Sequence, residues 1–229
     1  MRQTLVQDVL DQLAALGSEH NRAGMARFGI NVENAYGVGI PPLRQLARTH
    51  RRDHPLALAL WTTGKHEARL LAAFVDDPRQ VTEEQMESWV RDFDSWDLCD
   101  QVCGNLFDRT PFAPARAVDW AHHQEQFVRR AGFVLMTQLA VHDKRAPDSL
   151  FLSFLPLVEH YADDDRNFVR KAVNWALRQI GKRNAALYAP ALELADQLRE
   201  QPSKSARWIG SDAARELRSE AVRTKLGLS

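Results

Sequence analysis

The sequence predicts an all-α fold in which pairs of helices repeat along the chain, as in an α-solenoid. Three observations lead to this prediction. Apolar residues recur at helical spacing, Gly and Pro stand between the helical segments, and one motif is repeated after about 40 residues. No segment shows the alternation of a half-buried strand. A chain of 229 residues is long enough to bury the core that such a fold needs.

Proline and glycine mark the ends of the predicted helices. The breaks, in chain order, are Pro41-Pro42, Gly64, Pro78, Thr110-Pro111, Ala146-Pro147, Gly181 and Gln201-Pro202. Two helix starts are also indicated. Residues 82–85 (TEEQ) form a capping box, and Asp94 or Ser95 can cap the helix that carries Trp96.

A repeated motif indicates how these helices are arranged. Residues 127–131 (FVRRA) are echoed about 40 positions later by residues 168–172 (FVRKA), and residues 206–208 (ARW) continue the pattern more weakly. This period is typical of HEAT-like or armadillo-like repeats, in which antiparallel helical pairs stack into a curved superhelix with one open, concave face. We therefore expect a single repeat domain over residues 1–229. An irregular bundle with one coincidental match is the alternative.

The overall charge gives no indication of a polyanionic partner, because 30 basic residues balance 30 acidic ones. Both kinds of charge are nevertheless grouped along the chain. The basic residues gather at Arg44 to Arg52, Arg129-Arg130, Arg166 to Arg183 and Lys204 to Lys225, and the acidic ones at Asp76-Asp77, Glu83 to Glu87, Asp92 to Asp100 and Asp163 to Asp165. This grouping predicts either a basic face on a neutral protein or ordinary scatter.

The predicted location and the predicted absence of cofactors rest on sequence patterns that are missing. No apolar run approaches the roughly 18 residues of a membrane span, and the first residues have no signal-peptide pattern, so we expect a cytoplasmic protein without membrane contact. Cys99 and Cys103 lie one helical turn apart, which suits reduced thiols and not a structural disulfide. No histidine spacing completes a metal site with them, so we expect neither a metal nor an organic cofactor.

The helix that begins near Ser95 places a carboxylate beside an aromatic ring. At 100° per residue, Asp100 lies about 40° from Trp96 and shares its arc with apolar residues. The arc expected to be solvated holds Asp97, Gln101, Asn105 and Asp108, and the arc expected to face the core holds Leu98, Cys99, Val102 and Leu106. Solvation therefore does not explain Asp100. It is either a partly buried acid with a structural partner or a functional carboxylate.

A second helix, which begins near Asn167, combines an aromatic ring with cations. Its packed side is expected to consist of Phe168, Val169, Ala172, Val173, Ala176, Leu177 and Ile180. Lys171, Arg178 and Lys182 surround Trp175 on the other side, and Arg130 takes the place of Lys171 in the preceding repeat. Such a ring within a positive rim suits nucleic acid, because cations neutralise phosphates and the ring packs on a sugar or base. The alternative is a half-buried core Trp with solvated basic neighbours.

These motifs together resemble the AlkD family of HEAT-like DNA alkylation repair proteins. The resemblance rests on residues 95–100 (SWDLCD), 127–131 (FVRRA) and 167–178 (NFVRKAVNWALR). Residues 36–47 (YGVGIPPLRQLA) resemble the family's entry into an early helix. In all, the resemblance extends from about Met25 to Leu217.

The resemblance implies a DNA glycosylase that removes cationic N3- and N7-alkylated purines from duplex DNA. It implies a basic concave surface that holds the DNA, without insertion of the damaged base into a deep pocket. The residues that match the family's catalytic ones are Asp100 as the acid, Trp96 and Trp175 as the aromatic contacts, and Arg130, or Arg129 next to it, as the cleft arginine. The further DNA contacts that we expect are Arg129, Lys171, Arg178, Lys182, Arg44, Lys204 and Arg207. A monomer is expected.

Two other functions are compatible with the repeats. Some branches of the AlkD-like superfamily bind DNA, including branched DNA, without repairing alkylation, and HEAT-like repeats also serve as protein-interaction scaffolds. The joint presence of the two tryptophans, Asp100 and Arg130 favours the enzyme over both.

Overall fold

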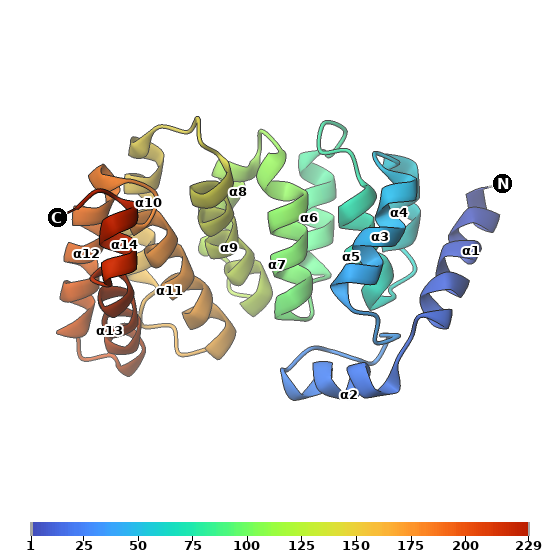
Figure 1. Cartoon of the computed structure of the whole chain (residues 1–229), viewed down its shortest axis with the longest axis horizontal. Coiled ribbons are helices and arrows are strands. Elements are labelled where there is room, and N and C mark those ends of the chain that lie inside the picture. Colours follow the sequence, from blue (N-terminus) through green and yellow to red (C-terminus); the bar gives the residue numbers. More distant parts are fainter. Residues whose placement is uncertain (1, 229) are drawn as a thin grey trace. The chain divides into compact units, whose positions relative to one another are not determined.

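The computed structural model describes residues 2–228, which form helices joined by short connections, with no strand among them (Figure 1). The first elements are α1 (Arg2–Ala15), α2 (Glu19–Arg27), α3 (Ile40–Ala47), η1 (Arg48–His50), α4 (His54–Trp61), α5 (His66–Val75), α6 (Glu83–Arg91), α7 (Trp96–Asn105) and η2 (Phe107–Arg109). The later elements are α8 (Ala113–Ala121), α9 (Gln126–His142), α10 (Asp148–His160), α11 (Asn167–Gly181), α12 (Ala185–Arg199), α13 (Lys204–Leu217) and α14 (Glu220–Lys225). The all-α prediction is confirmed.

The chain divides into two compact units, one ending at Thr110 and the other beginning at Pro111. This boundary coincides with one of the breaks predicted from proline. The single repeat domain over residues 1–229 stays a prediction. Within residues 2–228, every helix is too short or too polar to serve as a membrane span.

The first unit is organised around α5, which packs against α3, α4 and α7. A cluster of aromatic rings completes its core. Trp61 of α4 stacks on Trp89 of α6 with ring centroids 3.9 Å apart, and Phe107 of η2 lies 6.3 Å from Trp89. The indole N–H of Trp61 donates to Asp92 Oδ2 at 2.7 Å, so the polar edge of this buried ring is satisfied. The cluster therefore ties α4, α6 and η2 together.

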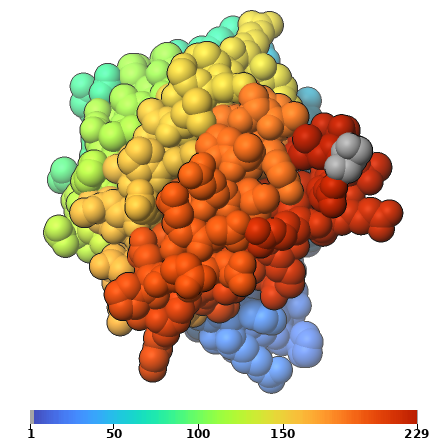
Figure 2. Space-filling model, turned by 90° about the vertical axis from the view of Figure 1, so that its left-hand side faces the viewer, coloured from blue at the N-terminus to red at the C-terminus, as the bar shows by residue number. Residues whose placement is uncertain are grey.

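The second unit has two layers of helices. Neighbours are in contact within the layer of α8, α10 and α12 and within the layer of α9, α11 and α13 (Figure 1). Glycines permit close approach between the layers. A Cβ at Gly132 of α9 would overlap the backbone of Ala121 in α8, and one at Gly210 of α13 would overlap the carbonyl oxygen of Ala195 in α12. Figure 2 shows the face of this unit formed by its last helices, in orange to red.

Each predicted break lies at a helix end or between two helices, but the breaks at residues 122–125 and 161–166 were not among those predicted from proline and glycine, and one predicted cap is absent. Pro41 and Pro42 occupy the first turn of α3, where a missing N–H costs no hydrogen bond. Thr82 Oγ1 accepts a hydrogen bond from the backbone N–H of Gln85 at 3.2 Å, which confirms the cap of α6. Ser95 occupies the N-cap position of α7, but its hydroxyl donates to Asp94 and makes no bond to the helix. The expected side-chain cap of α7 is therefore absent.

The repeated motif occupies equivalent positions in α9 and α11. Phe127 and Phe168 are each the second residue of their helix, and their ring centroids are 5.7 Å apart. The predicted packed side of α11 is confirmed for Val169, Ala172, Val173, Ala176, Leu177 and Ile180, which are buried. Phe168 stays partly exposed. The period of about 40 residues therefore reflects two adjacent, equivalent helices.

Candidate functional site

α7 presents Trp96 and Asp100 one helical turn apart. Leu98, Cys99 and Val102 are buried in the core of the first unit, as the helical pattern predicts. Trp96 and Asp100 both retain partly exposed surfaces. Because residues four positions apart are neighbours on a helix, the aromatic ring and the carboxylate form one continuous surface on α7.

Two thiols lie on the buried side of this helix. Cys99 and Cys103 are buried and are not joined in a disulfide, as predicted. Burial raises the pKa of Cys103 well above its ordinary value, and the neighbouring Cys99 and Asp100 raise it further. The Cys103 thiol is therefore protonated at neutral pH and packs as a small apolar group.

The nitrogen edge of Trp96 is held by the loop that follows α2. The indole N–H donates to the backbone carbonyl of Phe28 at 2.9 Å. The side chain of Phe28 itself is 73% exposed, which is unusual for a large apolar residue. This contact joins residues 68 positions apart, and no spacing in the sequence indicates it.

Asp97 corrects an expectation from the helical pattern, which placed it on the solvated side. Its Oδ2 lies 2.9 Å from Nε2 of His66, the first residue of α5, and His66 is only 5% exposed. The other carboxylate oxygen of Asp97 is buried without a hydrogen bond within residues 2–228. Asp108 was expected on the same solvated side and is also buried, because it belongs to η2 and not to α7. The His66–Asp97 pair fixes the start of α7 against α5.

The His66–Asp97 pair predicts a pH-dependent stability. Burial lowers the pKa of His66, but the hydrogen bond to Asp97 and the charges of Asp97, Glu67 and Asp94 outweigh it, so the net pKa is raised. A raised folded-state pKa contributes stability below the unfolded pKa of about 6.5, and this contribution disappears as the pH rises through the folded-state value. The stability difference between the wild type and His66→Gln should therefore be larger at about pH 5.5 than at about pH 8.5. Urea unfolding at both pH values measures it, and an equal difference at both would contradict the assignment.

Glu67, beside His66, anchors the segment that precedes α3. The Glu67 side chain is fully buried and accepts three backbone N–H groups, from Tyr36 at 2.8 Å, Gly37 at 2.7 Å and Val38 at 3.0 Å. Gly37 has a φ of +82°, which favours glycine there. This segment is the start of the motif at residues 36–47, and the carboxylate accounts for its fixed conformation.

The cations near Trp175 are not all directed to solvent. Arg178 Nη1 lies 2.5 Å from Glu216 Oε2 and 3.7 Å from Asp212 Oδ2, and Lys182 also binds Glu216. Burial raises the pKa of Glu216, but the bonds to Lys182 and Arg178 outweigh it, so the net pKa is lowered. Arg178 and Lys182 therefore tie α11 to α13 with their charges balanced. Trp175 is half-buried, and Lys171 is exposed.

The two adjacent arginines of α9 are both buried. Arg129, 8% exposed, pairs with Asp164 at 2.7 Å and lies over the Tyr161 ring, 4.4 Å from its centroid. Arg130, 5% exposed, donates to the backbone carbonyl of Phe168 in α11. The repeat register equates Arg130 with Lys171, but only Lys171 reaches solvent. The difference arises because the side chain of Arg130 is directed to the next helix of its layer.

The remaining expected DNA contacts are exposed. Lys204 is the first residue of α13, and Arg207 donates to the carbonyls of Gln201 and Pro202, which fixes the turn before that helix. Arg44 of α3 reaches Asn105 Oδ1 of α7 at 3.3 Å and is also exposed.

The family model of the DNA alkylation repair enzymes matches residues 9–217 of the chain. The chain belongs to this family. No curated protein matches the sequence. A solved structure described as "a new family of proteins related to the HEAT-like repeat DNA glycosylases with affinity for branched DNA structures" matches with a TM-score of 0.81 at 20% identity, covering 97% of this chain and 96% of that chain. This similarity confirms the HEAT-like repeat fold.

The residues expected from the alkylation repair family are distributed over both units. Trp96 and Asp100 belong to the first unit, and Arg130 and Trp175 belong to the second. The basic residues fall into two groups. Among residues 2–228, no carboxylate lies within 4.0 Å of the cationic groups of Arg44, Lys171, Lys204 and Arg207, whereas Arg129, Arg178 and Lys182 are balanced by acids. A basic concave face stays a prediction.

Proposed function

We propose that the protein is a DNA glycosylase that excises cationic N3- and N7-alkylated purines from duplex DNA. The observation that carries this proposal is the joint surface of Trp96 and Asp100 on α7, in a chain of the alkylation repair family. The Asp100 carboxylate stays partly exposed beside the Trp96 ring, while Leu98, Cys99 and Val102 of the same helix are buried in the core.

The chemistry of base loss fits these two side chains. An alkylated purine already carries positive charge, so the electron pair of the broken C1′–N bond leaves with the base as a neutral product. Positive charge then develops on the deoxyribose, and Asp100 stabilises it as a nearby anion. Water adds to C1′ and gives its proton to the carboxylate. The electron-rich face of Trp96 attracts the same cation, an interaction of about 1 to 2 kcal/mol when desolvated.

In this proposal residues of the second unit supply further DNA contacts. Trp175 offers a second aromatic face to the cationic nucleotide, and the exposed Lys171 neutralises a backbone phosphate. Arg130, held against α11 through the carbonyl of Phe168, contributes positive potential from its buried position and acts as a positioning residue. The proposal requires that these residues and Asp100 face the same DNA. Cross-linking of one lesion-bearing duplex to both α7 and α11 would test that requirement.

The decisive experiment is incubation of the protein with a duplex that carries a single 7-methylguanine. Free 7-methylguanine should appear faster than by spontaneous loss, and an abasic site should remain in the strand. An identical duplex with an unmodified guanine is the control, because its neutral leaving group gives no such release. Release at the spontaneous rate would contradict the enzyme proposal.

A second candidate function is binding of branched DNA without catalysis. The observation that favours it is the solved relative described by its affinity for branched DNA structures. Comparison of a four-way junction with a linear duplex of equal length distinguishes the two functions. Tighter binding of the junction together with spontaneous-rate base release would support the second candidate.

A further inference from the structure

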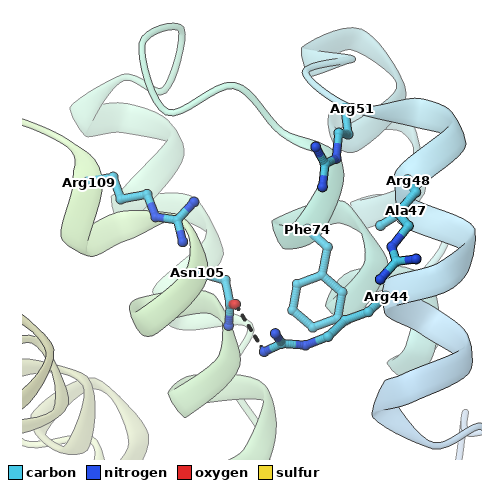
Figure 3. A pocket seen from close by; sticks show the side chains of 7 residues that line it. All are labelled: Arg44, Ala47, Arg48, Arg51, Phe74, Asn105 and Arg109. Atoms are coloured by element: carbon cyan, nitrogen blue, oxygen red, sulfur yellow. Dashed lines mark hydrogen bonds between the residues drawn. The ribbon is translucent and has the colours of Figure 1, made fainter. Parts of the chain in front are cut away.

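The first unit contains a pocket lined mainly by arginines. Figure 3 shows Arg44, Arg48 and Arg51 on one side and Arg109 on the other, around the ring of Phe74. The pocket has a volume of about 220 Å³. Its lining residues come from α3, η1, the connection after η1, α5, α7 and η2, and none of them is acidic. A protein with no net charge therefore carries a local concentration of four positive charges.

These charges are poorly compensated within the protein. Among residues 2–228, Arg44, Arg48 and Arg51 have no carboxylate within 4.0 Å, and Arg109 reaches Asp108 only at 4.0 Å. The contacts of Arg44 are uncharged, since it donates to Asn105 and lies 5.4 Å from the centroid of the Phe74 ring. The positive charges around this pocket repel each other. An anion bound between them is attracted by all of them and relieves that repulsion.

Asp76 and Asp77, which follow the lining residue Phe74 within three positions, have other partners. Asp76 lies 2.7 Å from His54 Nδ1 and accepts from Gln85 at 2.7 Å, and Asp77 is paired with Arg79 at 2.6 Å. They line an adjoining hollow together with Arg51 and Arg109 but not the arginine pocket itself. The positive potential of the pocket is thus not cancelled from that side.

The backbone fixes the arginines in place. Arg44 and Arg48 are one turn apart, so both project from the same side of α3 and its continuation η1. After Arg51 the chain turns sharply at Arg52, which has a φ of +60°, a conformation that costs a non-glycine residue about 1 kcal/mol or more. The next residue, Asp53, caps α4 by accepting from the N–H of Leu56 at 3.0 Å. This connection fixes the backbone from which Arg48 and Arg51 extend to the pocket.

We propose that this pocket binds an internal phosphodiester group of DNA, an inference that rests on the proposed DNA-binding function. Guanidinium groups bind phosphate oxygens through paired N–H donors, and several converging on one site favour a phosphate over a single carboxylate. The Phe74 ring provides an apolar surface for the adjoining sugar. Asn105, to which Arg44 is bound, lies five residues after Asp100 on α7, or about 7.5 Å along the helix. A DNA strand whose damaged nucleotide lies at Asp100 therefore passes near the pocket. A phosphate bound in the pocket would fix the position of that strand along the protein.

The test compares two double variants that remove the same charge. Arg48→Ala with Arg51→Ala removes two pocket arginines, and Arg91→Ala with Arg145→Ala removes two exposed arginines outside it. Binding of an unmodified duplex is measured over a range of salt concentrations. The pocket variant should bind at least about 10-fold more weakly at low salt, and its slope of log affinity against log salt should be shallower than that of the wild type by up to about 0.9, the contribution of one phosphate contact. The control variant should keep the wild-type slope.

The outcomes separate this inference from the proposed catalytic function. The binding measurement needs no lesion, so a difference between the variants supports the pocket even if the wild type releases no 7-methylguanine. Equal slopes for the two variants overturn the pocket even if the wild type is an active glycosylase. Duplexes with and without 5′-phosphates are compared in parallel. A difference that appears only with 5′-phosphates would assign the pocket to strand ends and contradict binding of an internal phosphodiester.

Discussion

Replacement of Asp100 by asparagine is expected to slow the release of 7-methylguanine by about 100- to 1000-fold while duplex affinity stays unchanged. Asparagine keeps the shape of the side chain but has no negative charge to stabilise the developing sugar cation and no basic oxygen to accept the proton of water. Single-turnover release from a duplex with one lesion measures the chemical step directly. Binding of the same duplex is measured in parallel with an unmodified strand.

A matched control for this variant is Asp8→Asn, which removes one carboxylate from the exposed surface of α1. It should retain the wild-type rate, because no side-chain contact in the described structure links Asp8 to α7. A rate within about 3-fold of the wild type for Asp100→Asn would exclude the proposed role, since a catalytic base contributes far more than that. A parallel loss of affinity and rate would instead indicate a role in DNA binding alone.

Sequence patterns were sufficient for the features that depend on local periodicity. The burial of Leu98 and Val102 on α7 follows from positions on one helix, and the equivalence of Phe127 and Phe168 follows from a repeat about 40 residues long. Likewise, the prolines at the start of α3 restrict the backbone within a single turn. In each case the feature depends on residues of one helix or of one repeated motif.

Pairings between separate helices were out of reach of the same reasoning. Glu216 follows Arg178 by 38 positions and Asp97 follows His66 by 31, and in neither pair does any motif connect the two residues. The helical pattern therefore placed Asp97 on a solvated face and Arg178 in an open positive rim, although each has a charged or hydrogen-bonding partner on a neighbouring helix. The arginine pocket shows the same limit, because η2 adds Arg109 to a group that begins at Arg44. The grouping of charges along the sequence indicated the arginines on one side of the pocket. It did not indicate that Arg109 lies on the other side.

Replacement of Glu67 by alanine should produce the largest loss of stability, about 3 to 5 kcal/mol. The change removes a buried acceptor and leaves the N–H groups of Tyr36, Gly37 and Val38 without their hydrogen bonds. Each unsatisfied buried N–H costs about 1 to 3 kcal/mol, and a cavity adds to the loss. Urea unfolding measures the effect as a shift in the midpoint at constant slope.

Glu67→Gln separates the hydrogen-bond pattern from the space that the side chain fills. The glutamine oxygen can replace Oε1 and accept from Gly37 and Val38, but its amide nitrogen then faces the N–H of Tyr36. Two of the three bonds are kept, so the loss should be roughly half of that for alanine. Glu33→Ala, which truncates an exposed glutamate of the same unit, should be neutral within about 0.5 kcal/mol. Equal losses for alanine and glutamine would mean that the negative charge, and not the number of accepted bonds, holds the segment before α3. In either case the effect should reach the candidate site, because Glu67 adjoins His66 on α5 and His66 holds the first turn of the helix that carries Asp100.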